Sequence, residues 1–397
     1  MSKPTLPTSF TNLLNINYPF VQAPMAGHST VDMCAAVCNS GGLGSIAGAR
    51  INGQTIIKQC NELKSKIGNK PFAINLFIPP NNPSPPTSLQ HTAVTTILHK
   101  IMNELHIEPN DLSTVPAVPD YNQQIQAVLQ ICPAALTFTF GMLSADIVQQ
   151  CKQLDIKVIG TATTAAEALY LAQHKCDAIV VQGCEAGGHR GSFLTDDLHI
   201  IEQSTIGLLS LLVQCKQVVP DYIPLIVAGG IGDSVTANSL FNAGADAICV
   251  GTLFLTTHES TIIPDVHKQL LLAPSNARKS NQSITAGQWN KINRPTCLTR
   301  VFSGKPARGI YNKIIHEFEP ISNATLPWNI QSEAVQPLQK YAGSKLKNGE
   351  YIQAWAGQSY SMCEVKSSAD VVNDIINGIY KLRQQTGNVK YESDTDC

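Results

Sequence analysis

Short apolar runs rich in β-branched residues alternate with helix-like stretches over the first 250 residues, and this alternation constrains the fold most strongly. Buried parallel strands read as continuous apolar runs, because both faces of the sheet are covered. The predicted strands are residues 19–23, 43–47, 72–77, 135–140, 157–160, 178–181, 224–228 and 247–250. The predicted helices are residues 31–39, 55–67, 121–131, 145–154, 165–174, 205–218 and 235–243. Eight such strands predict an α/β fold, the (β/α)8 TIM barrel.

A doubly wound open sheet is the alternative fold. Such a sheet normally carries a Gly-x-Gly-x-x-Gly turn directly after its first strand. The corresponding turn here reads Ala23-Pro-Met-Ala-Gly-His28, which does not fit that pattern. The sequence therefore favours the barrel.

Two segments interrupt the alternation. Residues 79–119 form a Pro-rich insertion with a helical stretch at 89–105, and we expect it to lie over the top of the barrel. Residues 256–367 lack a strand–helix pattern, so they predict a second, smaller and mainly helical domain that caps the substrate site.

A last amphipathic helix, residues 369–384, follows this smaller domain. Its apolar stripe predicts a return to the barrel as the eighth helix. The barrel would then comprise residues 1–255 and 368–385, with the smaller domain inserted before the last barrel helix. Residues 386–397 predict a polar tail.

Composition excludes several classes of function. The 28 Lys and Arg residues nearly balance 29 Asp and Glu residues, and no basic run suggests nucleic acid as a partner. No apolar run approaches the roughly 18 residues of a membrane span, and no secretory signal begins the chain, so we expect a cytoplasmic protein. Twelve cysteines without a Cys-x-x-Cys pair predict buried free thiols, and ten histidines without metal-binding spacing predict no metal site.

Two glycine turns follow the seventh and eighth predicted strands, where barrels often bind phosphate. They read Ala228-Gly-Gly-Ile-Gly-Asp233 and Val250-Gly-Thr252. Bare backbone N–H groups beside a helix start favour an anion. The turns therefore predict phosphate contacts from a cofactor or substrate at Gly229, Gly230, Gly251 and Thr252. Two tight turns without a ligand are the alternative.

The loop Val181-Gln-Gly-Cys-Glu-Ala-Gly-Gly-His-Arg-Gly-Ser-Phe193 places one histidine among four glycines after a strand. Glycine lets a backbone approach a ligand closely, and a histidine titrates near neutral pH. We therefore predict that His189 acts as an acid, a base or an anion partner, with Gly187 and Gly188 beside the ligand. A loop histidine bonded to backbone is the alternative. We expect Arg190 to pair locally with Glu185 or Asp196.

Polar side chains at the ends of apolar strands also need partners. The amides of Asn75 and Gln182 must be hydrogen-bonded when buried, and a ring with amide-like edges, such as flavin, would satisfy them. A polar layer within the barrel is the alternative. Ala23, Pro24 and Met25 form a rigid turn that could support one face of such a ring.

At this point several motifs together resemble the nitronate monooxygenases. They are Gln22-Ala-Pro-Met-Ala-Gly27, Phe72-Ala-Ile-Asn-Leu76, Gly183-Cys-Glu-Ala-Gly-Gly-His-Arg-Gly191, Ile226-Val-Ala-Gly-Gly-Ile231, Gly251-Thr-Leu-Phe254, Thr299-Arg-Val-Phe-Ser-Gly304, Pro306-Ala-Arg-Gly309 and Trp355-Ala-Gly-Gln358. The resemblance covers residues 17–360.

The resemblance implies an FMN-containing barrel that oxidises alkyl nitronates, such as propionate 3-nitronate, with O2. The products would be a carbonyl compound and nitrite or nitrate, formed through a flavin semiquinone. His189 falls on the catalytic histidine. The implied flavin contacts are Ala23, Pro24, Met25, Asn75, Gln182, Gly187, Gly230, Gly251 and Thr252.

Two other functions remain open. An FMN-dependent NAD(P)H reductase, acting on enoyl-acyl carrier protein or on quinones, would share the Gly-Gly-His loop. A barrel that binds flavin or phosphate without catalysis is the second. The Arg190-Gly-Ser-Phe193 continuation favours the monooxygenase. A homodimer is a further expectation.

Overall fold

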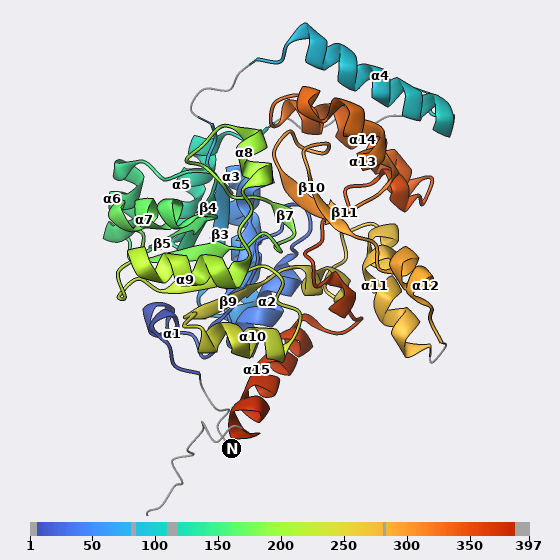
Figure 1. Ribbon diagram of the computed structural model, residues 1–397. Helices are drawn as coiled ribbons and strands as arrows, with labels where there is room; N and C mark the ends of the chain where they lie inside the picture. Colours follow the sequence, from blue (N-terminus) through green and yellow to red (C-terminus); the bar gives the residue numbers. More distant parts are fainter. Residues whose placement is uncertain (1–5, 81–84, 109–117, 281–282, 386–397) are drawn as a thin grey trace, which may run out of the picture.

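Eight parallel strands form the centre of the molecule in the computed structural model, which describes residues 6–80, 85–108, 118–280 and 283–385 (Figure 1). The predicted tail at 386–397 lies outside the described residues, as do parts of the 79–119 insertion. The strands are β1 (Phe20–Gln22), β2 (Gly44–Ala47), β3 (Phe72–Phe77), β4 (Ala135–Thr139), β5 (Lys157–Ala162), β6 (Ala178–Gln182), β8 (Leu225–Ala228) and β9 (Ala247–Val250).

These strands close into a barrel. Their order is β1-β9-β8-β6-β5-β4-β3-β2, and every pairing between neighbours is parallel. A parallel bridge between Val21 and Leu43 joins the two end strands. The predicted (β/α)8 barrel is thereby confirmed.

Helices surround the barrel. They are α2 (Val31–Ser40), α3 (Gly53–Ile67), α5 (Tyr121–Ile131), α6 (Ala145–Gln153), α7 (Ala165–Gln173), α9 (Leu208–Val218), α10 (Ser234–Asn242) and α15 (Ser368–Gln385), with the short α8 (Leu198–Gln203) before α9. Helix α15 packs against α10 and α2, as an eighth barrel helix must. Its buried stripe includes Val371, Ile375 and Ile379.

The barrel interior changes character along its axis. Small side chains such as Ala73, Ala135 and Ala178 form an apolar cluster with Phe10, which belongs to the short helix α1 (Ser9–Leu14). The sequence pattern did not predict this helix. The next inward positions of β3 and β4 carry Asn75 and Thr137, so the interior becomes polar toward the carboxyl ends of the strands.

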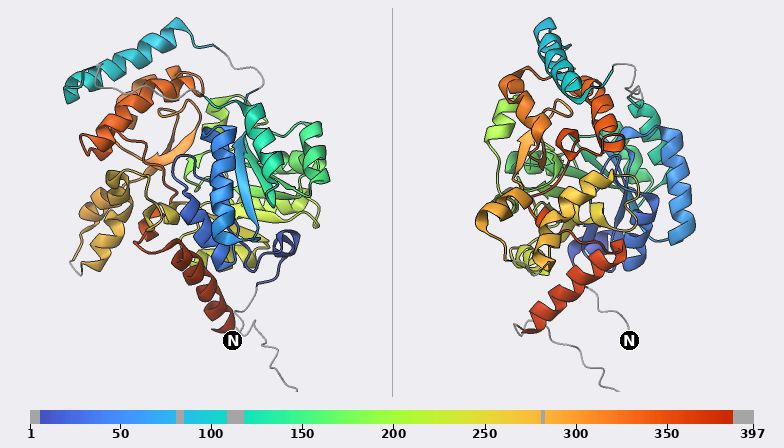
Figure 2. Two further views of the ribbon diagram at one scale, coloured as in Figure 1. Left: turned by 180° about the vertical axis from the view of Figure 1, so that it is seen from behind. Right: turned by 90° about the vertical axis from the view of Figure 1, so that its right-hand side faces the viewer.

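The insertion after β3 does not lie over the barrel, and that expectation is wrong. Its helix α4 (Ser88–Leu105) packs on α13 (Lys313–Phe318) and on the 3-10 turn η4 (Glu319–Ala324). Figure 2 shows α4 beside these elements and apart from the strands. Val94 and Ile101 are fully buried there, because α4 covers an apolar surface of the smaller part of the molecule.

The smaller part contains a β-hairpin that the sequence pattern did not predict. Strands β10 (Thr296–Thr299) and β11 (Ala307–Ile310) pair antiparallel, and β11 also pairs with β7 (Gly188–His189) from the barrel. Helices α11 (Asp265–Lys279), α12 (Ala286–Ile292) and α14 (Ile330–Ser344) flank the hairpin, followed by the 3-10 turns η5 (Gly349–Tyr351) and η6 (Tyr360–Met362). The boundaries of this part as a domain, residues 256–367, stay a prediction.

Candidate active site at the mouth of the barrel

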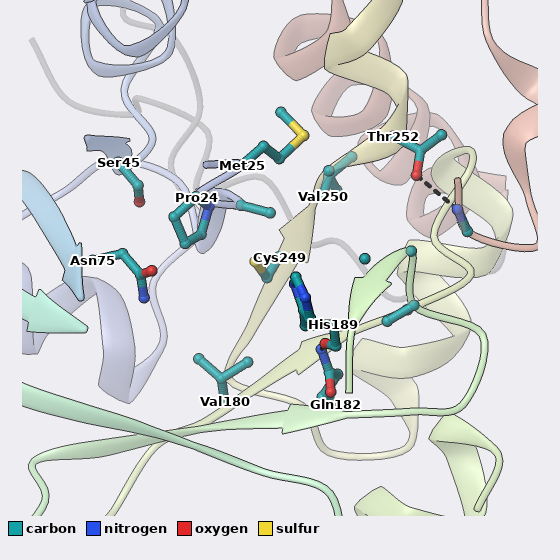
Figure 3. A pocket seen from close by; sticks show the side chains of 18 of the residues that line it. Pro24, Met25, Ser45, Asn75, Val180, Gln182, His189, Cys249, Val250 and Thr252 are labelled. Carbon is teal, nitrogen blue, oxygen red and sulfur yellow. Dashed lines mark hydrogen bonds between the residues drawn. The ribbon is translucent and has the colours of Figure 1, made fainter. Parts of the chain in front are cut away.

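One cavity opens at the carboxyl ends of the strands, where barrel enzymes place their active sites (Figure 3). The structure brings every predicted site residue to its wall. These residues are Ala23, Pro24, Met25, Asn75, Gln182, Gly187, Gly188, His189, Gly229, Gly230, Gly251 and Thr252. Which of them contacts a ligand stays a prediction.

His189 projects into this cavity from β7, a two-residue strand held by its pairing with β11. Its Nε2 lies 2.8 Å from the Oγ of Ser303, which is buried. The Ser303 hydroxyl donates to the Lys305 carbonyl at 3.2 Å, so its oxygen is left to accept from Nε2–H. This arrangement favours the Nε2–H tautomer and leaves the lone pair of Nδ1 available to a ligand.

Aromatic rings enclose the imidazole. The ring centroids of Phe77, Phe140 and Trp355 lie 5.9, 5.8 and 5.7 Å from that of His189. Burial, reinforced by the positive charges of Arg50 and Lys305, lowers the pKa of His189 to about 3. The imidazole is therefore neutral at pH 7 in this state.

The amides of Asn75 and Gln182 have partners within the protein. Asn75 Nδ2 donates to the Thr137 hydroxyl at 3.0 Å. Gln182 Nε2 donates to the His189 carbonyl at 2.9 Å, and its Oε1 accepts from the Gly191 N–H at 2.8 Å. Each amide thus has at least one partner within the protein, and the contact of either with a flavin stays a prediction. Gln182 also fixes the loop that carries His189.

Arg190 anchors the same loop from the other side. The residue is 5% exposed, and its guanidinium donates to the carbonyls of Gln182 and Thr163, at 2.8 and 3.0 Å. The predicted pairing with Glu185 or Asp196 is wrong. Glu185 instead accepts from the Leu208 N–H at the start of α9. The acceptors of this buried guanidinium are thus backbone carbonyls at the carboxyl ends of β6 and β5 rather than carboxylates.

Glu167 completes the anchoring of the loop, and sequence reasoning missed it. This carboxylate on α7 is 2% exposed. It accepts from the Thr163 N–H and from the backbone N–H groups of Phe193 and Leu194. Hydrogen bonds of this kind from backbone N–H groups to one buried side chain fix the loop around it.

The two glycine turns expose backbone donors to the cavity. Gly229 and Gly230 have φ of +125° and +67°, conformations that residues with a side chain rarely adopt. The backbone N–H groups of Gly230, Gly251 and Thr252 donate to no acceptor within the described residues. Successive free N–H groups of this kind form a concave anion site.

A segment of the smaller part closes over these turns. The Gly357 N–H donates to Thr252 Oγ1 at 3.0 Å, the contact dashed in Figure 3. The Ser359 hydroxyl donates to the Gly230 carbonyl. Gly187 permits this closure, because a Cβ there would lie 2.5 Å from the Gly357 nitrogen. A glycine is therefore needed at position 187 for packing within the protein, whether or not a ligand binds there.

A second histidine lines the cavity, and a third contacts that histidine. His28 follows β1, lines the cavity, and contacts His267 edge-on with ring centroids 5.9 Å apart. Burial is the main cause that lowers the pKa of both, to about 3 for His267. His267 Nε2 lies 3.1 Å from the Trp355 carbonyl, so it positions the residue whose ring contacts His189.

The charge of the lining is one-sided. Among the described residues that line the cavity, Arg50 is the single Lys, Arg, Asp or Glu. Within the described residues, no three His, Cys, Asp or Glu side chains form a group that could bind a metal ion. No helix in the same parts of the chain is long and apolar enough to cross a bilayer. The positive charge of Arg50 makes the cavity suited to anions.

Three contributors to the site had no role in the sequence analysis: Ser303, Arg50 and Lys305. Ser303 lies in the Thr299–Gly304 motif, which the sequence analysis identified, but the sequence does not show that Ser303 contacts His189. Lys305 places its Nζ 4.2 Å from the Phe140 ring centroid, and burial lowers its pKa to about 8. No local pattern marks Arg50.

The barrel fold and this site define an enzyme. Residues 8–378 match the family model described as nitronate monooxygenase. Two proteins called "Probable nitronate monooxygenase", from Staphylococcus aureus strains MSSA476 and Newman, are each 32% identical over 374 residues. The alignment covers 94% of this chain and 98% of each relative.

Solved structures agree with this match. The structure of a nitroalkane oxidase from Streptomyces ansochromogenes superposes with a TM-score of 0.80 at 29% identity, over 96% of this chain and all of that one. FabK from Thermotoga maritima, with a TM-score of 0.69 at 21% identity, shares the fold; that match covers 97% of this chain and 100% of FabK. The chain belongs to the nitronate monooxygenase family, and it is an oxidoreductase that acts on a small molecule.

Proposed function

We propose that this protein binds FMN at the mouth of the barrel and oxidises alkyl nitronates, such as propionate 3-nitronate, with O2. The products are a carbonyl compound and nitrite or nitrate. The observation that carries the proposal is the placement of His189 in one cavity with two glycine turns whose N–H groups are free. Family membership supports the same reaction class.

The cavity suits the proposed cofactor at both ends. The free N–H groups of Gly230, Gly251 and Thr252 would bind the phosphate, because they form an anion site beside a helix start. The turn containing Pro24 and Met25 would support one face of the ring, since the Ser29 hydroxyl accepts from the Met25 N–H and fixes it. The bound flavin supplies the electron transfer.

The protonation state of His189 would depend on the substrate, and for a neutral nitroalkane the neutral imidazole would act as a base. With Nε2–H directed at Ser303, the Nδ1 lone pair can accept a proton from the carbon of a neutral nitroalkane. A nitronate is already an anion and needs no such step. Its negative charge would instead raise the pKa of His189 and favour a protonated ring that holds the nitro oxygens.

The absorbance spectrum of the purified protein tests this function directly. We expect a yellow protein whose flavin absorbance bleaches when propionate 3-nitronate is added without oxygen, and recovers when air is admitted. A flavin that nitronates leave unchanged but NADPH bleaches rapidly would assign the chain to the reductase alternative. A yellow protein inert to both would indicate a non-catalytic flavin-binding barrel.

A further inference from the structure

Arg50 is the last residue of the 3-10 turn η1 (Gly48–Arg50), which follows β2 directly. Its side chain is exposed and lines the cavity, where no carboxylate is present. Within the described part of the chain, no Asp or Glu lies within ion-pair distance of it. A guanidinium carries a permanent positive charge, so its counter-ion must come from solvent or from a ligand.

The guanidinium is held in place rather than free to swing. Arg50 Nη2 donates to the Ser332 Oγ on α14 at 3.0 Å. Ser332 is buried, and its hydroxyl donates onward to the Phe302 carbonyl at 3.3 Å. One of the five guanidinium donors is thus used for orientation, and the others can bind a planar anion such as a carboxylate.

The charge of Arg50 lies in the same cavity as His189, the residue proposed to act on the substrate. This charge contributes to lowering the pKa of His189 and of His28. The glycine turns proposed for phosphate follow β8 and β9, and β1 separates β9 from β2 in the barrel. Arg50 therefore follows a strand that neighbours neither β8 nor β9, and it lies close enough to both histidines to act on their charge.

We propose that Arg50 binds a carboxylate of the substrate, and that it makes the protein selective for nitronates that carry a second negative charge. This inference rests on the proposed function for the reacting group. The two parts of such a substrate would have separate partners: the nitronate lies at His189 and the carboxylate pairs with the guanidinium fork.

Arg50→Met tests the selectivity with two substrates that differ only in the carboxylate. For the flavin-loaded protein we expect kcat/KM on propionate 3-nitronate to fall about 10- to 100-fold, mostly through KM. The value on propyl-1-nitronate should change less than about threefold. Arg50→Lys should give an intermediate loss, because the charge remains but the fork does not. Arg383→Met is the matched control, since Arg383 lies on α15 and donates to Asn238.

Binding of inert anions gives a readout that does not depend on turnover. By calorimetry, succinate should bind the flavin-loaded wild type at least about tenfold more tightly than butyrate, which lacks one carboxylate. Arg50→Met should abolish that difference. Equal losses on both nitronates, or an unchanged preference for succinate, would overturn the inference. So would loss of flavin from Arg50→Met, which would assign the residue to the cofactor phosphate. A wild type that prefers succinate through Arg50 but oxidises no nitronate would refute only the proposed function.

Discussion

The protonation state of His189 follows from its surroundings rather than from its sequence context. Aromatic rings and two cations hold its pKa at about 3, against 6.5 for an unperturbed histidine. Because the unfolded chain binds the proton first as pH falls, the stabilisation from the neutral ring is complete above about pH 6.5. It is lost between pH 6.5 and about 3. A bound anion would raise the lower limit of this window, because it raises the pKa of His189 in the folded state alone.

His189→Asn should abolish most turnover without displacing the cofactor. Asparagine is too short to replace the Nε2 contact with Ser303, and it cannot accept or hold a proton. We expect kcat/KM on propionate 3-nitronate to fall about 100-fold or more, with flavin content unchanged. Steady-state kinetics and the absorbance ratio of flavin to protein measure the two quantities. His174→Asn is the control, because this exposed histidine stacks on Tyr170 on the outer helix α7. Turnover equal to wild type would remove His189 from the chemistry.

For single residues, the sequence predicted correctly which polar side chains need a hydrogen-bond partner, but it did not predict which partner each one has. Asn75 and Gln182 were recognised as amides that must be bonded, yet Thr137 and the loop backbone bond them. Arg190 was recognised as locally paired, but with carbonyls instead of acids. Ser303 contacts His189, and Arg50 lines the cavity, although both are far from His189 in the sequence. The amino-acid sequence alone contains no signal for such contacts.

Elements were predictable in proportion to their burial and length. All eight barrel strands coincide with apolar runs, because strands covered on both faces admit few polar residues. The missed strands β7, β10 and β11 have two to four residues, and β7 pairs with β11 across a large sequence separation, as between Ala307 and His189. Their polar residues show no strand periodicity. The sequence therefore does not predict the hairpin that pairs with the strand of His189.

A substitution in the turn after β8 tests the proposed phosphate site. Gly230→Asp adds a carboxylate at the free N–H groups proposed for phosphate, so we expect protein that folds but is colourless. Gly68→Asp is the matched control: Gly68 has φ of +64° against +67° for Gly230 and ends α3. It places the same side chain at a similar positive φ without touching the cavity. Flavin absorbance per protein measures the outcome. Normal flavin content in Gly230→Asp would place the phosphate elsewhere.

The site exists only where two parts of the molecule meet. Barrel residues supply the glycine turns and the loop of His189, while the smaller part supplies Ser303 and the segment around Gly357. Buried Arg308 on β11 joins them, since its guanidinium donates to the Cys184 carbonyl of the barrel and to Thr296 of the hairpin. Separate motions of the two parts would break these bonds, so we expect them to be stable only together.

Cooperative unfolding tests this dependence, and the chain provides its own probes. All three tryptophans lie between residues 256 and 367, at Trp289, Trp328 and Trp355, so their fluorescence reports on the smaller part. Far-UV circular dichroism reports mainly on the barrel helices. We expect one urea midpoint from both signals.

Arg308→Met sharpens the same test. Removing this guanidinium leaves the Cys184 and Thr296 carbonyls without their donor, which should destabilise the protein by about 1–3 kcal/mol. If the parts are coupled, both midpoints fall together, because the lost bonds contribute to one transition. If the fluorescence midpoint alone falls, or already lies below that of the dichroism in the wild type, the smaller part unfolds independently. His189 would then keep its barrel loop but lose Ser303 and the strand pairing that aim it into the cavity.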